Sequence, residues 1–449
     1  MAVPTALIPV LALVVARAPI AHATAAPDAG YAHHPTAWAG VDSTARRTPT
    51  ADSADTLPLV RVTFGGQART RAEGVSNYQL GAGPGRRDVH GTTRLVLGAR
   101  MDVGPVYLGV EGRHAASHGR ELPGGARRPN DHDVWDLQAA HVGVRWSAIV
   151  PLDVRIGRQP LALGRQRLVG VSDWSNARRA FDGARVEAGL GDVTVEAFRA
   201  RPVVVHPTRL NRGDSATVLT GAMLGAGDGA LQLYALDFDQ ERATGRQHRR
   251  TLGARVTRDA TPSRPGLEVE GAWQGGRQDG RRVDAWFVAA ELSTIVPAAW
   301  STELTLGLDA ASGDGDAADD VVQTFHVPFA SSHTHGGYVD VVGRPNAVEA
   351  RLVAVTTPTE RLEIRAAAHR FTRFRMADAV YAKNGATIAS GGGSRHVGTE
   401  LDLTASFRAA RGLRVLAGYG HFAPGAALRA APDGALPTSW GFLGTTFDF

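Results

Sequence analysis

The chain of 449 residues has no cysteine and only one lysine, Lys383. The lack of cysteine excludes a disulfide framework, a cysteine-ligated zinc site and a thiol nucleophile. Positive charge is therefore carried almost entirely by arginine, whose guanidinium stays protonated and binds carboxylates in a two-pronged geometry. The formal net charge is +5, so the chain is basic.

Long hydrophobic segments are also missing. The mean hydropathy is −0.14, which excludes a membrane protein built from many apolar helices. Hydrophobic residues nevertheless make up 43% of the chain, too many for a disordered protein. Length alone suggests about three domains. A single large domain agrees better with the alternation of apolar and polar residues described below.

The N-terminus carries the pattern of a secretory signal. Residues 6–16 are apolar, and two small-x-small cleavage patterns follow at residues 21–23 and 23–25. An apolar run this short cannot span a membrane as a helix, so we predict a signal peptide over residues 1–25. No basic residue precedes the run, and an apolar helix of a cytosolic fold is the alternative. Residues 26–58 are rich in Ala, Thr, Pro, Asp and Ser and predict a flexible leader.

Beyond the leader, apolar and polar residues alternate almost throughout. Val60, Val62 and Phe64 fall on one face of an extended segment, whereas Arg61 and Thr63 fall on the other. Such runs are about 9–12 residues long, as tilted transmembrane strands require. About 18 runs start near residues 59, 92, 105, 135, 152, 181, 192, 217, 231, 249, 267, 283, 301, 346, 361, 396, 412 and 439. The register is ambiguous at residues 138–141 and 197–201, where bulges are expected.

This pattern predicts an all-β fold, a transmembrane antiparallel up-and-down β-barrel of about 18 strands over residues 59–449. Some connections are minimal, such as residues 102–104, whereas others are long and polar, such as residues 115–134, 313–345 and 373–395. Short periplasmic turns and long extracellular loops are typical of outer-membrane barrels. The final strand ends on the aromatic residue Phe449, which resembles the insertion signal of bacterial outer-membrane proteins. We therefore predict that the protein lies in the bacterial outer membrane. Aromatic residues are only 6%, few for the usual girdles, and a secreted β-sandwich or propeller is the alternative. No repeat of 40–50 residues supports a propeller.

One stretch carries a family resemblance. Residues 155–185 read RIGRQPLALGRQRLVGVSDWSNARRAFDGAR. This stretch resembles the alginate-export family of outer-membrane barrels, with its G-R-Q, G-x-x-R-L, D-W-x-N and F-D-G-x-R segments. Later segments around residues 312–346, 369–381 and 418–425 follow the same family order. The resemblance implies an outer-membrane barrel over the mature chain, although members of so broad a family need not export alginate.

The same stretch concentrates arginines with two aspartates. Such a cluster on the wall and an inward loop would line a positive constriction, because rings of charge set the ion selectivity of a pore. The alternative is a salt-bridge network that only rigidifies the barrel. The predicted pore-lining and substrate-binding residues are Arg155, Arg158, Gln159, Arg167, Asp173, Arg179, Asp182 and Arg185.

Other groups of residues give weaker evidence for a metal site or an active site. The acidic segment 309–320 has oxygen ligands and glycines that calcium can use, but a solvated loop is favoured. His326, His333 and His335 lack a fixed metal-ligand spacing. The motifs of nucleotide-binding, metalloprotease and serine-hydrolase sites are absent, so we predict no enzyme, no cofactor and no bound metal.

The sequence therefore predicts an outer-membrane porin or export channel with an arginine-lined lumen. Its expected solute is an acidic, uronate-type polysaccharide or oligosaccharide. The rivals are a general or anion-preferring porin and a structural or adhesive barrel with binding loops. Expected partners are anionic polysaccharide or small anionic solutes, outer-membrane lipid, the outer-membrane assembly machinery and periplasmic export components, but no nucleic acid.

Overall fold

The computed structural model describes residues 60–82, 87–122, 125–297, 300–431 and 434–449. The predicted signal peptide, residues 1–25, and the predicted leader, residues 26–58, lie outside the described residues. Among the described residues, no helix is long and apolar enough to cross a membrane.

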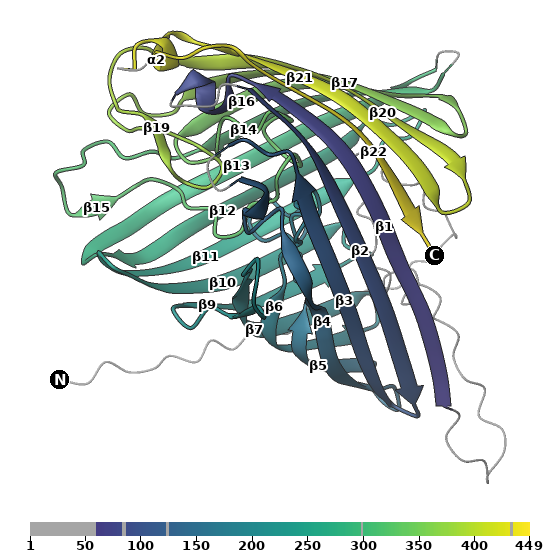
Figure 1. Ribbon diagram of the computed structural model, residues 1–449. Coiled ribbons are helices and arrows are strands. Elements are labelled where there is room, and N and C mark those ends of the chain that lie inside the picture. Colours follow the sequence, from purple (N-terminus) through teal and green to yellow (C-terminus); the bar gives the residue numbers. More distant parts are fainter. Residues whose placement is uncertain (1–59, 83–86, 123–124, 298–299, 432–433) are drawn as a thin grey trace, which may run out of the picture. The chain divides into compact units, whose positions relative to one another are not determined.

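Eighteen long antiparallel strands form one closed wall (Figure 1). They are β1 (Val60–Ser76), β2 (Arg87–Val103), β3 (Val106–His118), β4 (Asp133–Trp146), β5 (Leu152–Gln159), β6 (Phe181–Leu190), β7 (Val193–Val204), β9 (Thr217–Ala226), β10 (Leu231–Arg242), β11 (Gly245–Arg258), β12 (Gly266–Gln278), β13 (Arg281–Val296), β14 (Thr302–Ala311), β16 (Ala347–Thr359), β17 (Leu362–Arg373), β20 (His396–Ala410), β21 (Leu413–Pro424) and β22 (Thr438–Asp448). The wall closes where β1 pairs with β22, from Gln67 opposite Asp448 to Ser76 opposite Ser439. Each predicted run corresponds to one wall strand, so the predicted barrel is confirmed.

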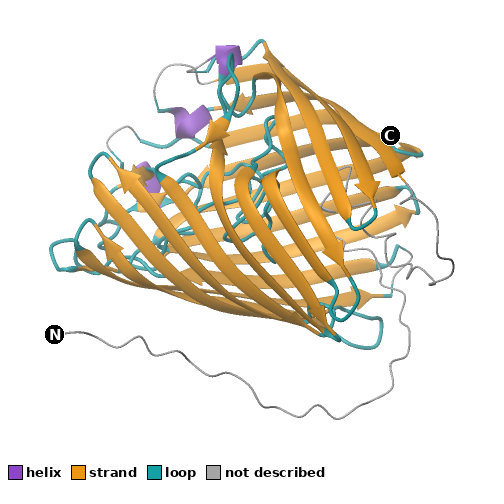
Figure 2. Cartoon of the chain, turned by 90° about the horizontal axis from the view of Figure 1, so that it is seen from below, coloured by secondary structure: helices purple, strands orange, loops and turns teal. Residues whose placement is uncertain are grey.

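The two rims differ as expected. One rim carries short turns such as residues 104–105, 191–192 and 411–412. The other carries the long connections, together with two tight turns at residues 243–244 and 279–280. Its small elements are η1 (Tyr78–Gly81), η2 (Gly125–Arg127), β8 (Arg212–Gly213), β15 (Val321–Val322), β18 (Val380–Tyr381), β19 (Thr387–Ala389) and α2 (Ala426–Arg429). Figure 2 shows loops that turn into the space enclosed by the strands.

Burial along the strands is the reverse of that in a soluble protein. On β12, the side chains of Glu268 and Glu270 are buried, whereas Leu267, Val269 and Trp273 are exposed. Apolar side chains therefore face outward and polar ones face the lumen. This is the arrangement that lipid around the wall requires, because every strand hydrogen-bonds to two neighbours and leaves no open edge.

The two expected bulges have different outcomes. Between β3 and β4 the register shifts where Glu111 pairs with Ala139 and Gly112 with Leu137, so Gln138 is the extra residue and this bulge is confirmed. Across residues 197–201 of β7 the pairing with β6 is continuous, so the second expected bulge is wrong. Glu196, Phe198 and Ala200 simply alternate with outward-facing residues.

The terminal Phe449 lies at the seam of the barrel. Its backbone exchanges hydrogen bonds of 2.8 and 3.1 Å with Gly66, and its ring lies so close to Gly66 that a Cβ there would meet the ring at 2.6 Å. Gly66 thus provides the space over which the ring packs. The side chain of Phe449 is nevertheless 55% exposed.

Deletion of Phe449 should therefore reduce assembly far more than stability. Full burial of such a side chain contributes about 1.5–3 kcal/mol, and a half-exposed one contributes less. A strand that ends on an aromatic residue also resembles an insertion signal. Membrane yield and the heat-modifiability midpoint of the deletion variant measure the two effects. Equal membrane yield of the two proteins would show that the terminal residue is incidental to assembly.

Candidate functional site in the barrel lumen

Loop 160–180, which joins β5 to β6, is fastened to the inner wall by Arg167. The buried guanidinium donates to Glu270 at 2.9 Å and Glu291 at 2.8 Å, and it also pairs with Glu268. Burial disfavours the charge, but Asp309 and these glutamates outweigh it and raise the pKa of Arg167 above its usual range. Arg167 is therefore a permanent cation that neutralises an acidic section of β12 and β13.

The same loop is also fastened to the opposite part of the wall. Arg69 and Arg94 donate to the backbone carbonyls of Asp173–Ser175 at 2.8–3.2 Å. The Trp174 ring packs edge-on against Phe442 of β22, with ring centroids 4.7 Å apart. Several wall strands separate β12 and β13 from β1, β2 and β22 in either direction around the barrel. Loop 160–180 therefore crosses the lumen.

Loop 312–346, between β14 and β16, lies against the crossing loop. The amide of Gly170 donates to the carbonyl of Phe329 at 3.0 Å, and the Phe329 amide donates to Leu168 at 3.0 Å. Arg179 donates to the carbonyls of Gly170, Phe329 and Ala330 and so connects both loops. Burial lowers the pKa of Arg179 to about 10, which leaves it charged at neutral pH.

An apolar cluster inside the barrel explains why these loops fold inward. The inner faces of several strands from β6 to β13 carry buried side chains such as Phe181, Phe238 and Phe287. These surfaces would be exposed to water if the loops projected outward, and their burial is favourable. The loops contribute Leu161, Leu163, Leu168, Val169 and Phe325 to the same cluster.

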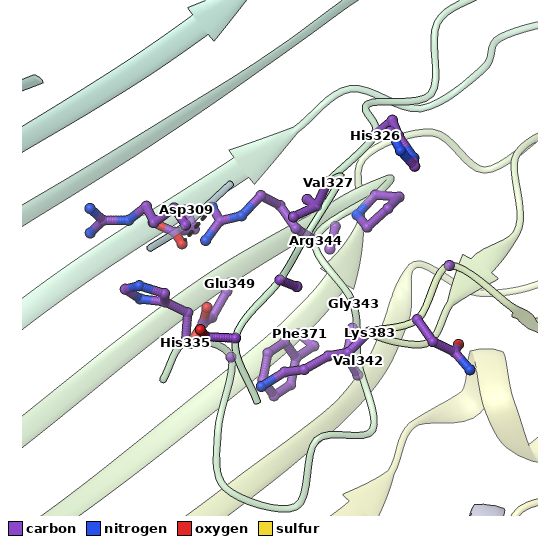
Figure 3. A pocket seen from close by; sticks show the side chains of 18 of the residues that line it. Asp309, His326, Val327, His335, Val342, Gly343, Arg344, Glu349, Phe371 and Lys383 are labelled. Carbon is purple, nitrogen blue, oxygen red and sulfur yellow. Dashed lines mark hydrogen bonds and ion pairs between the residues drawn. The ribbon is translucent and has the colours of Figure 1, made fainter. Parts of the chain in front are cut away.

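A cavity of about 80 Å³ lies among loop 312–346, loop 374–395 and the wall (Figure 3). Its charged groups are paired: Arg344 donates to Asp309 at 2.9 Å, and Lys383 pairs with Asp340. Burial lowers the pKa of His326 in this lining to about 3, so the ring is neutral at neutral pH. The cavity therefore offers polar but largely compensated walls.

Three arginines on neighbouring strands face the lumen on the short-turn side of the crossing loop. They are Arg145 on β4, Arg155 on β5 and Arg185 on β6, here called the arginine row. Register places Arg155 directly opposite Arg185. Their side chains are 35%, 17% and 25% exposed, so the row is accessible from the lumen.

Aromatic and acidic neighbours hold the arginine row in place. Arg155 donates to the Tyr107 hydroxyl at 3.0 Å, and the guanidinium of Arg145 lies 4.8 Å from the centre of the same ring. Arg145 bonds Asp153 at 3.1 Å, and Arg185 bonds Glu196 at 2.9 Å. These carboxylates limit repulsion between the guanidiniums while leaving part of each one exposed.

The eight sequence-predicted residues fall into three places. Arg155 and Arg185 belong to the arginine row, and Gln159 is buried on the same strand face, where it donates to the carbonyls of Gly157 and Gly183. Arg167, Asp173 and Arg179 belong to the crossing loop and its anchors.

Arg158 and Asp182 lie elsewhere. They pair with each other at 2.8 Å and share the strand face of Ile156, which is 57% exposed on the outer surface. Arg155 and Arg158 are three residues apart on one strand, and odd spacings point to opposite faces. Arg158 and Asp182 therefore share the outer strand face, but the Arg158 side chain is only 12% exposed and also lies 3.6 Å from the buried carboxylate of Asp136.

Segment 309–320 and the three histidines carry no metal site in the described residues, where no group of three or more His, Cys, Asp or Glu side chains is placed to hold an ion. Asp309 faces the lumen, where it binds Arg344. His333 stacks on Trp440, with ring centroids 4.7 Å apart, and His335 bonds the carbonyl of Arg165.

Several lumen arginines were not predicted from the sequence. They include Arg69, Arg94 and Arg145, described above, together with Arg344, Arg351 and Arg365. Arg351 on β16 pairs with Glu291 at 2.6 Å, and Arg344 lies in loop 312–346. Arg365 on β17 lies over the ring of Tyr338 at 5.7 Å and forms no ion pair with a described carboxylate. Strand alternation with Leu352, Ala366 and other outward residues is the signal that could have identified Arg351 and Arg365.

Several solved structures from Pseudomonas aeruginosa share this fold. OpdK matches with a TM-score of 0.58 and 13% identity, over 86% of this chain and 99% of that chain. OccK2 (OpdF), solved in complex with glucuronate, matches with a TM-score of 0.58 and 13% identity, over 86% and 98%. OccD3 (OpdP) matches with a TM-score of 0.57 and 13% identity, over 86% and 91%. No curated protein sequence matches the chain significantly.

At these identities the structural matches establish the fold, and the family comes from the sequence. The alginate export family matches residues 60–442, which covers the barrel from the start of β1 into β22. The resemblance first noted in residues 155–185 is thereby confirmed. The chain belongs to the alginate export family and is a bacterial outer-membrane β-barrel.

Proposed function

We propose that the protein is an outer-membrane channel for anionic solutes, and that its arginine row selects them. The observation that carries this proposal is the position of Arg145, Arg155 and Arg185 on the lumen face, each partly exposed beside the passage. A guanidinium keeps its charge at any working pH and binds carboxylates through two parallel hydrogen bonds. Family membership supports export or uptake of an acidic sugar as the task.

The crossing loop supports a narrow rather than a general pore. Because loop 160–180 is fastened to both sides of the lumen, a solute has to pass beside it. A uronate-type sugar or a single extended chain of such sugars suits this passage better than a bulky solute. Glucuronate, with which the OccK2 structure was solved, is an acidic sugar of this kind. As part of the proposal we assign the same class of solute to this chain.

The remaining roles are proposed on the same basis. The apolar outward face needs outer-membrane lipid, and a barrel of this kind needs the outer-membrane assembly machinery. Periplasmic export components are proposed partners if the solute is a newly made polysaccharide. We propose no enzymatic activity, cofactor or nucleic-acid partner.

Oligomers of galacturonate should block the ionic current of single channels, whereas neutral oligomers of the same length should not. Each carboxylate that meets the arginine row binds weakly, and several weak contacts slow transit enough to be resolved as current blockades. Planar-bilayer recording with added oligomers measures this. Equal blockade by neutral and acidic oligomers would favour a general porin, and no conductance at all would favour an adhesive barrel.

A further inference from the structure

Exposed arginines also occur on the outer face of the wall, and toward the long-loop rim most of the described ones lie between β7 and β13. Along β7 the outward positions run Val195, Ala197, Arg199 and Arg201, and the last two are exposed. On the neighbouring strands, exposed outward arginines include Arg250 on β11, Arg277 on β12 and Arg282 on β13; Arg246, nearer the rim on β11, is exposed too and pairs with Asp239. We call Arg199, Arg201, Arg250, Arg277 and Arg282 the outer arginine patch.

The rest of the wall differs from this sector. Along the outward faces of the described β14, β16, β20, β21, β22 and β1, no arginine lies toward the long-loop rim. Single exposed arginines occur there only on β17, at Arg370, and on β2, at Arg87. The patch is therefore a local feature rather than a band around the barrel.

Tryptophans indicate the depth of the patch in the membrane. Register aligns Leu252, Trp273 and Trp286, which are 55%, 47% and 37% exposed on the outer surface. Arg250 follows Leu252 on the outward face toward the long-loop rim, and Arg282 lies beyond Trp286 in the same direction. Aromatic residues of this kind lie at the interface between hydrocarbon and headgroups. The guanidiniums beyond them are thus at headgroup level, where an outward arginine is tolerated.

The two arginines of β7, like Arg277 on β12, form no ion pair with a described carboxylate. Arg199 donates to the hydroxyl of Thr220 at 3.0 Å. Arg199 and Arg201 are two residues apart on one face, about 6.6 Å along the strand, so both can reach one phosphate group. On β11 and β13, Arg250 and Arg282 stand 3.4 Å from Asp237 and Asp284, and such exposed pairs are weak enough to exchange partners.

We propose that the outer arginine patch binds the phosphate groups of lipid A, the phosphorylated glycolipid of the outer leaflet. Long loops face the cell exterior, so the patch meets this leaflet. Guanidiniums bind phosphate oxygens through two parallel hydrogen bonds, and the exposed apolar residues next to the patch contact the acyl chains. The bound lipid would fix this sector of the barrel against its surrounding membrane.

The test is titration of the detergent-purified protein with diphosphorylated lipid A, followed by native mass spectrometry. We expect R199Q/R201Q to bind lipid A about tenfold more weakly than the wild type. R199K/R201K keeps the positive charge but not the two-pronged geometry, so it should lose less affinity than R199Q/R201Q. The matched control R87Q/R370Q removes two outward arginines outside the patch and should bind normally, and dephosphorylated lipid A should bind poorly to every protein.

Three outcomes would overturn the proposal. One is equal lipid A binding by R199Q/R201Q and the wild type. Another is an equal loss in R87Q/R370Q, which would show that any outward arginine suffices. The third is complete displacement of lipid A by millimolar inorganic phosphate, which would identify a site for free phosphate instead.

Discussion

Replacement of Arg167 by methionine is expected to open the lumen and to destabilise the protein by about 3–5 kcal/mol. Removal of one partner from a buried charge network leaves its other members uncompensated, and this cost range is typical. Here Glu268, Glu270 and Glu291 would lose the cation that they share. The loop would detach from β12 and β13, so single-channel conductance should rise while the heat-modifiability midpoint falls.

Arg165→Met is the matched control for this prediction. Arg165 lies in the same loop, is 33% exposed and stands 3.7 Å from Glu268 and 3.9 Å from Glu291, too far for strong hydrogen bonds. Its replacement should change conductance and stability little. An R167M barrel with wild-type conductance and an unchanged midpoint would mean that the loop is held by its other contacts.

Replacement of Trp174 by alanine is expected to release the other end of the crossing loop. Truncation of a packed tryptophan to alanine lowers the free energy of unfolding by about 3–5 kcal/mol. Because Trp174 is partly exposed, we expect its replacement to cost close to the lower value. The ring contacts Phe442 and Trp440 of β22 and lies under Arg71, whose guanidinium is 3.9 Å from it. Thermal unfolding and conductance should therefore change in the same direction as for R167M.

A lipid-facing tryptophan provides the control for Trp174. Trp146 is 57% exposed at the end of β4, so W146A should leave conductance unchanged. The R167M/W174A double variant should lose less stability than the two single losses combined, because both changes release one loop. Strict additivity would contradict a single element fastened at two points.

Strand positions could be predicted from the sequence because lipid and lumen impose opposite chemistry on alternate residues. The run from Leu267 to Glu270 alternates apolar with polar, and the wall strand β12 contains it. The closing contact between β1 and β22 could not be predicted, since no local pattern indicates which strands meet after so long a chain. The bulge at Gln138 shows in the sequence as a break in alternation. In β7 the adjacent Ala200 and Arg201 suggest a similar break, but a small alanine fits the inner face without one.

The lumen could be predicted only in part. The motif R-I-G-R directs attention to both Arg155 and Arg158, but their spacing of three puts them on opposite faces of β5. The partners of Arg167 could not be predicted from the sequence, because the glutamates that bind it lie more than 100 residues away in the chain. Tertiary pairing, not local pattern, decides which arginines are buried in carboxylates and which remain accessible.

The most direct test of the arginine row is the reversal potential of the channel in a salt gradient. We expect the wild type to be anion-selective and R155A/R185A to lose most of this selectivity. The attraction between one guanidinium and an anion about 4 Å away, at an effective dielectric constant near 20, is about 4 kcal/mol before screening by salt and water. If about 1.4 kcal/mol of this difference between anion and cation remains after screening, the channel prefers anions tenfold. The control R158A removes an arginine from the outer strand face and should leave the potential unchanged. A cation-selective wild type, or anion selectivity that survives in R155A/R185A, would show that the arginine row does not select the solute.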